Sequence, residues 1–129
     1  MASPIRRVPY AWATVYALST AEVFLPTTGW MSATTVASLR PTPEMRARTG
    51  NIEIAFAYQT ANAEGSPDTA VALTAWLTAD GIGYNSFVDV SSATGSKQMI
   101  RFGIMVRLST GAALGLARVS GALDIQAPG

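Results

Sequence analysis

The sequence predicts an all-β protein, folded as an antiparallel β-sandwich or jelly roll of about seven or eight strands. Two observations carry this prediction. Along several segments, apolar residues alternate with polar or small ones, which is the period of a strand with one buried face. Turn-forming residues recur roughly every dozen positions, and no long amphipathic helix separates the segments. The connections are therefore too short for parallel βαβ units.

The clearest strand is Lys97–Leu108, and the second clearest is Asn51–Thr60. Both alternate strictly, with their large apolar side chains at even-numbered positions. If both strands bury these faces, each such side chain contributes roughly 1.5–3 kcal/mol on full burial. The expected centre of the core is then Ile52, Ile54, Phe56, Tyr58, Ile100, Phe102, Ile104 and Val106.

Residues 1–9 are expected to form an extended N-terminal arm, because Pro4 and Pro9 restrict themselves and the residues before them to extended conformations. A single β-sandwich domain is expected to span residues 10–126. Residues 127–129 then form a short C-terminal tail.

Within the domain, Tyr10–Leu18 is expected to be a strand with one bulky face and one small face. Further strands are expected at residues 30–39, 70–78, 84–90 and 116–126, and turns at residues 25–29, 40–43, 61–69 and 91–96. The one place where a helical turn is expected is Glu44–Arg48, with Pro43 near its start.

The amino-acid composition excludes a disordered chain and argues against nucleic acid or membranes as partners. The chain has 129 residues, of which 49% are hydrophobic and 13% charged, and its net charge is +1. Disordered chains combine low hydrophobicity with high net charge, so disorder is excluded. No field of one sign is available to attract nucleic acid or an anionic membrane, so neither is an expected partner.

Cysteine and histidine are both absent. Disulfides and thiolate metal sites are therefore excluded, and neither a metal nor a cofactor is expected. Histidine is also the commonest general base, so its absence argues against an enzyme. No apolar run reaches the length of a membrane span. Met1–Leu18 is a poor signal peptide, because Pro9, Trp12 and Tyr16 interrupt its apolar stretch.

Four carboxylates lie in or beside expected loops, namely Glu64, Asp68, Asp80 and Asp89. Two of them meeting at one end of a sandwich could bind Ca²⁺ or form the acid/base pair of a glycoside hydrolase. Their spacing fits no calcium-binding loop. The favoured interpretation is that they make hydrogen bonds typical of turns.

The polar faces of the expected strands carry Glu53, Arg101, Arg107, Arg118 and Asp124. They form either a partner face, on which guanidinium groups grip carboxylates, or a solvated sheet face with cross-strand charge pairs. The second interpretation is favoured. Among the aromatic residues, Trp76 has the opposite parity to Val71 and Leu73, so it is the best candidate for an exposed or interfacial ring.

Three pieces of the chain form strand-and-turn patterns: Ala57-Tyr58-Gln59-Thr60, Val88-Asp89-Val90-Ser91 and Ile100-Arg101-Phe102-Gly103. With these pieces, the run from Ile54 to Ile125 resembles the small β-sandwich proteins found among virion components of tailed bacteriophages. The resemblance covers a little over half of the chain. It implies a virion structural protein that decorates or cements a capsid, and it carries over no catalytic residue.

The sequence therefore favours a non-enzymatic phage virion protein at the capsid surface. It would associate with itself, for example as a trimer, and with the major capsid protein or another virion protein. The candidate contact residues are Arg6, Arg7, Tyr10, Trp76, Arg101 and Arg107. The alternative is a carbohydrate- or receptor-binding module of a tail or fibre, which needs exposed aromatics beside polar groups. A Glu/Asp-based hydrolase is a third, minor hypothesis.

Overall fold

The computed structural model describes residues 5–62, 66–83 and 86–128. Its strands are β1 (Ile5–Ala17), β2 (Val23–Pro26), β3 (Met31–Ser32), β4 (Ser38–Thr49), β5 (Ile52–Ala61), β6 (Val71–Ala72), β7 (Gly81–Ile82), β8 (Val88–Asp89), β9 (Met99–Leu108) and β10 (Gly115–Gln126). Two single turns of helix lie between them, η1 (Ala33–Thr35) and α1 (Ser91–Thr94). Most of the pairing is made by the five long strands β1, β4, β5, β9 and β10.

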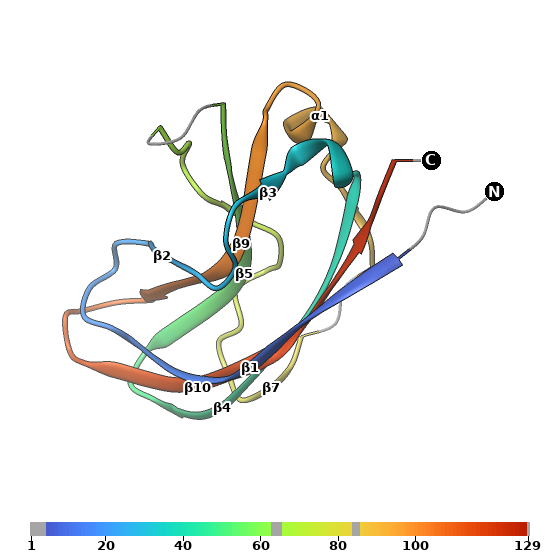
Figure 1. The fold of residues 1–129 in the computed structure, drawn as a ribbon. Coiled ribbons are helices and arrows are strands. Elements are labelled where there is room, and N and C mark those ends of the chain that lie inside the picture. The colour runs from blue at the N-terminus through green and yellow to red at the C-terminus, as the bar shows by residue number, and fades with distance from the viewer. Residues whose placement is uncertain (1–4, 63–65, 84–85, 129) are drawn as a thin grey trace.

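The strands form two antiparallel sheets that pack together as a β-sandwich (Figure 1). Sheet A has the order β1-β10-β4-β7, and β8 also pairs with β4. Sheet B has the order β2-β9-β5-β6, and β3 also pairs with β9. The chain passes repeatedly from one sheet to the other, and this strand order is that of a jelly roll. The predicted all-β sandwich is confirmed.

The core is built on the pairing of β5 with β9, which runs in register from Ile52 opposite Leu108 to Ala61 opposite Met99. The even-numbered side chains predicted as the core centre are all buried, with none more than 9% exposed. Sheet A covers them with its own buried side chains, among them Leu39, Met45, Val119, Leu123 and Ile125. The predicted core centre is therefore confirmed.

Strand β1 begins at Ile5, five residues earlier than the sequence pattern indicates. Residues 5–9 pair with residues 122–126 of β10, so they belong to sheet A and are not a free arm. Residues 1–4 lie outside the described residues. Truncation at Pro9 would consequently remove part of the sheet as well as the terminus.

A β-bulge lies in β1 between Tyr10 and Ala13, where three steps along β1 oppose two along β10. The extra residue exchanges the faces of the strand. Tyr10 points into the core, whereas Trp12 and Tyr16 are exposed and Val15 is buried. The single bulky face expected for this strand is therefore divided between core and solvent.

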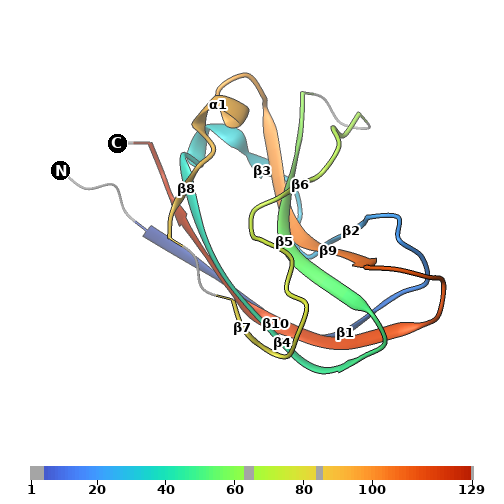
Figure 2. The ribbon, with the colours of Figure 1, turned by 180° about the vertical axis from the view of Figure 1, so that it is seen from behind.

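The helical turn expected at Glu44–Arg48 is wrong, because these residues continue strand β4. The prolines that suggested a chain break are accommodated along an edge. Pro41 and Pro43 lie between the β4 residues that pair with β8 and those that pair with β7 (Figure 2). The carbonyl of Pro43 faces this side, where it accepts a hydrogen bond from Gly83. A missing N–H costs little where no strand pairs alongside.

Other expected elements are shorter in the structure or displaced. The turn expected at residues 25–29 contains the end of β2, and the strand expected at residues 30–39 is interrupted by η1. Of the strand expected at residues 70–78, only β6 forms, together with an isolated bridge between Ile54 and Leu77. Of the strand expected at residues 84–90, β8 forms, and residues 84–85 lie outside the described residues.

Gly103 permits β2 to cross close to β9. A Cβ built on Gly103 would lie 2.2 Å from the Leu25 carbonyl oxygen and 2.8 Å from the Pro26 Cα. These are backbone atoms of β2, so they cannot move aside as a flexible side chain would. Only glycine fits this position without displacing the edge strand of sheet B.

We predict that Gly103→Ala lowers the free energy of unfolding by about 1–3 kcal/mol, because the new methyl group would clash with the backbone of β2 where that strand pairs with β9. Gly29→Ala is the matched control, since nothing lies within 4 Å of a Cβ built there. Urea unfolding followed by far-UV circular dichroism measures both. Equal stability of the two variants would contradict the close approach.

Tyr10 packs its ring on Phe56, with 4.6 Å between ring centroids, and is 8% exposed. Its buried hydroxyl has no hydrogen-bond partner among the described residues. Burial raises the pKa of Tyr10 to about 12, whereas the nearby Thr27 hydroxyl donates to the carbonyl of Phe102. A buried hydroxyl without a partner carries its desolvation cost uncompensated.

Tyr10→Phe should therefore raise the free energy of unfolding, by about 1 kcal/mol, because it removes an unpaired buried hydroxyl and keeps the ring. Tyr16→Phe, at a side chain that is 59% exposed, should change it by less than about 0.5 kcal/mol. Denaturant titration gives both values. A clear loss of stability in Tyr10→Phe would mean that the hydroxyl has a partner.

Candidate interaction surfaces

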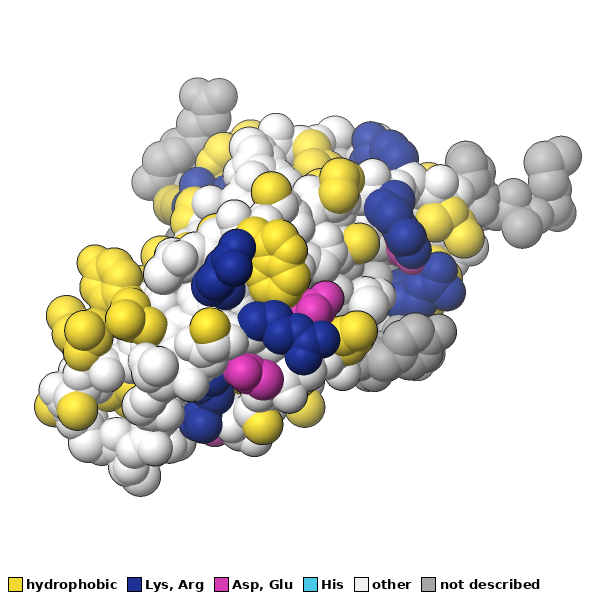
Figure 3. All heavy atoms as spheres, turned by 90° about the horizontal axis from the view of Figure 1, so that it is seen from below, with side chains coloured by type: hydrophobic (Ala, Val, Ile, Leu, Met, Phe, Trp, Pro, Cys, Tyr) yellow, Lys and Arg dark blue, Asp and Glu magenta, His cyan; other side chains and the backbone are white. Residues whose placement is uncertain are grey.

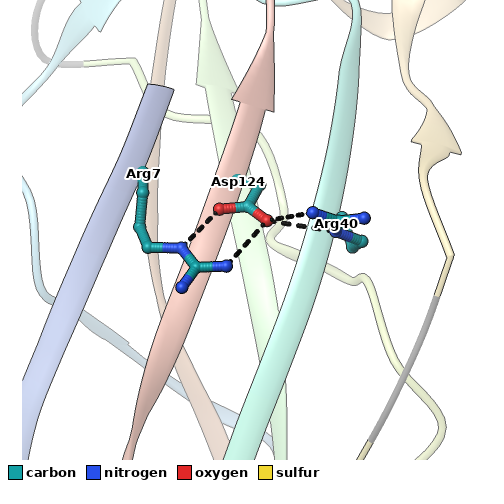
Figure 4. Close-up of polar contacts among 3 residues, drawn as sticks. All are labelled: Arg7, Arg40 and Asp124. Atoms are coloured by element: carbon teal, nitrogen blue, oxygen red, sulfur yellow. Dashed lines mark hydrogen bonds and ion pairs between the residues drawn. The ribbon is translucent and has the colours of Figure 1, made fainter. Parts of the chain in front are cut away.

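The outer face of sheet A carries an ion triad across three strands (Figure 4). Strand register sets Arg7 of β1 and Arg40 of β4 on either side of Asp124 of β10. Arg7 Nε donates to Asp124 Oδ1 at 2.8 Å, and one Arg40 Nη donates to Asp124 Oδ2 at 2.7 Å. Arg40 also lies over the ring of Phe87, 4.7 Å from its centroid.

Asp124 is only 3% exposed, although its parity places it on the outer face. The hydrogen bonds from Arg7, followed by those from Arg40, hold its pKa at about 2, against an opposing effect of burial. The Arg7 side chain itself remains 64% exposed. Its neighbour Arg6, the other basic contact candidate of this segment, is exposed and lies near Met31.

The outer face of sheet B carries paired arginines. Arg107 donates to Glu53 Oε1 at 2.9 Å and to Glu22 Oε1 at 3.2 Å. Arg101 donates to Gln59 Oε1 at 2.9 Å and lies 4.4 Å from the centroid of the Trp30 ring. Both arginines bond to the residue directly opposite on β5. The favoured interpretation, a sheet face with cross-strand polar pairs, describes this arrangement.

Trp76 is half-buried, and its ring is covered by the Arg107 guanidinium at 3.9 Å from the centroid. The exposed indole of this molecule is that of Trp12, at 44%. Sequence parity missed it because the bulge after Tyr10 changes the face of the strand. Tyr10, a further contact candidate, is in the core for the same reason and presents no surface to a partner.

The loop carboxylates make local contacts. Asp89 Oδ1 accepts from the Ser91 N–H at 2.8 Å, and Asp80 Oδ1 accepts from the Arg48 N–H at 3.0 Å. Asp68 accepts from Lys97 and Thr60, and these hydrogen bonds lower its pKa. Glu64 lies outside the described residues. Among the described residues, no cluster of three or more potential metal-ligating side chains forms.

Exposed apolar side chains gather at the end of the sandwich where the β1–β2 and β9–β10 connections lie (Figures 1 and 3). This apolar end comprises Tyr16, Leu18, Val23, Leu114 and Leu116, which are 37–59% exposed. A groove of about 280 Å³ opens beside it, lined by residues of β1, β2 and their connection, none of them charged. Such a contiguous patch is typical of an interaction surface. No helix of the described chain is long and apolar enough to cross a membrane.

Among known proteins, similarity to this chain is found in solved structures and not in sequences. No protein-family model and no curated protein sequence matches this chain. Solved structures of infectious bursal disease virus do match. T=1 particles derived from this virus give a TM-score of 0.65 at 12% identity over 96% of this chain. The structure of the Gx strain gives a TM-score of 0.64 at 16% sequence identity over 99% of this chain. The VP2 subviral particle gives a TM-score of 0.63 at 14% identity over 96% of this chain.

The fold is a viral capsid-like β-sandwich. This chain spans about a third of the length of the matched viral chains, 31–34%. The expected resemblance to virion proteins is therefore confirmed for the fold. The matching structures are those of a viral capsid protein, VP2, rather than of tailed-phage decoration proteins.

The ion triad predicts an acid-dependent loss of stability. The folded pKa of Asp124, about 2, lies below the ordinary value of 3.8. Its stabilisation is therefore fully present above about pH 5 and is lost progressively as the pH falls through the folded pKa near 2, by about 2 kcal/mol in all. Urea unfolding between pH 6 and pH 2 measures this loss. Asp124→Asn should be less stable at pH 6, and the difference from the native chain should shrink on acidification. A difference that stays constant with pH would contradict the assignment.

Proposed function

We propose that this chain is a non-enzymatic structural protein of a virion and forms a β-sandwich unit of a capsid-like assembly. The observation that carries the proposal is the match of 96–99% of the chain to viral capsid structures. Two of those structures are described as a subviral particle and as T=1 particles. Because this chain spans about a third of theirs, the proposal draws on the sandwich unit alone.

The apolar end is the proposed contact surface, and its occupant is another copy of this chain. Five large apolar side chains meet there, from the ends of β1, β2 and β10 and from the connections beside them, and the adjoining groove has no charged lining. Burying a leucine in such a contact contributes roughly 1.5–3 kcal/mol. The low charged fraction of the chain, 13%, also favours association over a solvated monomer.

A finer proposal is that the protein decorates the capsid of a tailed phage and contacts its major capsid protein. The sequence pieces around Tyr58, Asp89 and Phe102 support it, as does the small size of the sandwich. Arg6 and the exposed flank of Arg7 are its contact candidates. The other contact candidates already have partners within the chain: Arg101 bonds to Gln59, and Arg107 bonds to Glu53 and lies over Trp76. They would bind the capsid protein only if they gave up these contacts.

Leu18→Asp is predicted to raise the dissociation constant of self-association at least about tenfold. The substitution removes the apolar burial of a leucine from the contact and would place a charged carboxylate there instead. Light scattering across a concentration series measures the mass of the native chain and of the variant. The native chain should form a closed oligomer at high concentration.

Val71→Asp is the matched control, since Val71 is 46% exposed and lies in β6, away from the apolar end. It should associate as the native chain does. A native chain that stays monomeric at every concentration would contradict self-association. Equal weakening by both substitutions would contradict the choice of surface.

A further inference from the structure

Trp12 has no role in the proposed assembly contact, and its environment differs from that of the other two tryptophans. Trp30 and Trp76 are half-buried, with an arginine 4.4 Å and 3.9 Å from their ring centroids. Trp12 is 44% exposed, and the nearest guanidinium carbon, that of Arg118, is 5.4 Å from its centroid. Trp12 therefore keeps more exposed indole surface than Trp30 or Trp76, although the Arg118 guanidinium lies over part of its ring on the outer face of sheet A.

The strand register sets polar side chains in a row beside this indole. Thr14 of β1 lies opposite Arg118 of β10, and Arg118 lies opposite Arg46 of β4. All three are exposed. Together with Trp12 they make up what we call the Trp12 face. Figure 3 looks onto this side of the molecule, where charged side chains surround a hydrophobic one over the middle of the sheet.

The charges of the Trp12 face are unbalanced. Arg118 and Arg46 are directly opposed across neighbouring strands, an arrangement of like charges that is unfavourable by itself. Arg46 is offset by Glu44, whose Oε2 is 2.7 Å from Arg46 Nε. Arg118 lies over the Trp12 ring but makes no ion pair with any described residue, so no described carboxylate occupies its planar set of donors. That geometry matches a carboxylate, which a guanidinium binds through two parallel hydrogen bonds.

We propose that the Trp12 face binds an acidic saccharide, a pyranose ring that carries a carboxylate. The C–H face of the sugar would stack on Trp12, and Arg118, assisted by Arg46, would hold the carboxylate. The Thr14 hydroxyl, which lies opposite Arg118 in the strand register, would bond to a sugar hydroxyl. The indole offers a stacking surface for a sugar ring, and Arg118 offers a bidentate partner for its carboxylate. An acidic peptide is the competing occupant, and one of the probes below tests it.

D-glucuronic acid and D-glucose are the matched probes, because they share a ring and differ in one carboxylate. Each is titrated into ¹⁵N-labelled full-length chain, and the three indole N–H signals are followed by NMR. Glucuronic acid should shift the Trp12 signal and leave those of Trp30 and Trp76 in place. Glucose should bind about tenfold more weakly or worse, because it lacks the charge-assisted hydrogen bonds.

Arg118→Gln should abolish the preference for glucuronic acid over glucose. Arg101→Gln, which removes a guanidinium from the other sheet face, should preserve it. The spectra of the variants also report whether each is folded. A Trp12 signal that glucuronic acid leaves unmoved overturns the proposal.

Two further probes distinguish binding through the sugar ring from binding through the carboxylate alone. Acetate carries the carboxylate without the sugar, and an equal effect of acetate would overturn the role of the indole. Tighter binding of a glutamate-rich peptide than of glucuronic acid would overturn the saccharide assignment in favour of an acidic protein partner. Each of these results is independent of the mass measured for Leu18→Asp, so the assembly proposal stands or falls separately.

Discussion

The rest of the structure depends on the pairing of β5 with β9. Their ten opposed residue pairs run without a bulge, and their even-numbered side chains fill the space between the sheets. Because the side-chain period of a strand is two, a slip by one residue would turn this whole set outward. The register therefore fixes the core, and it also sets Glu53 against Arg107 and Gln59 against Arg101 on the outer face. One ladder specifies both the interior and the polar pairs over it.

The two outer faces use arginine differently. On sheet B, the guanidinium groups are occupied by carboxylate, amide and aromatic neighbours, so that face is internally satisfied. On sheet A, Arg7 and Arg40 are paired with Asp124, whereas Arg118 lies over the exposed Trp12 ring and has no carboxylate partner among the described residues. The apolar side chains gather at a third place, the end of the sandwich. The molecule thus separates a packed polar face, an open polar face and an apolar end.

Strict alternation made β5, β9 and the core centre predictable from the sequence, since a two-residue period has few other physical explanations. It failed where the backbone departs from that period. In β1, one inserted residue sends Trp12 and Tyr16 outward and Tyr10 inward, and no side-chain pattern announces such a bulge. In β4, Pro41 and Pro43 suggested that the strand ends. The structure tolerates them because they lie between the β4 residues that pair with β8 and those that pair with β7, and these partner strands are too distant in the sequence to be recognised beforehand. The apolar end could not be foreseen, because it is assembled from residues at the ends of β1, β2 and β10 and in their connections, which are far apart in the sequence.

The form of β1 also limits how copies of this chain could add to one another. It is the outermost strand of sheet A, thirteen residues long, and a free margin of that length would be a template for continuous sheet growth between molecules. Pro9 has no N–H group to pair with a neighbouring strand, and the bulge between Tyr10 and Ala13 bends β1. Fibrillar stacking along this border is consequently interrupted within a few residues. Backbone pairing between copies along β1 is therefore disfavoured relative to side-chain contacts.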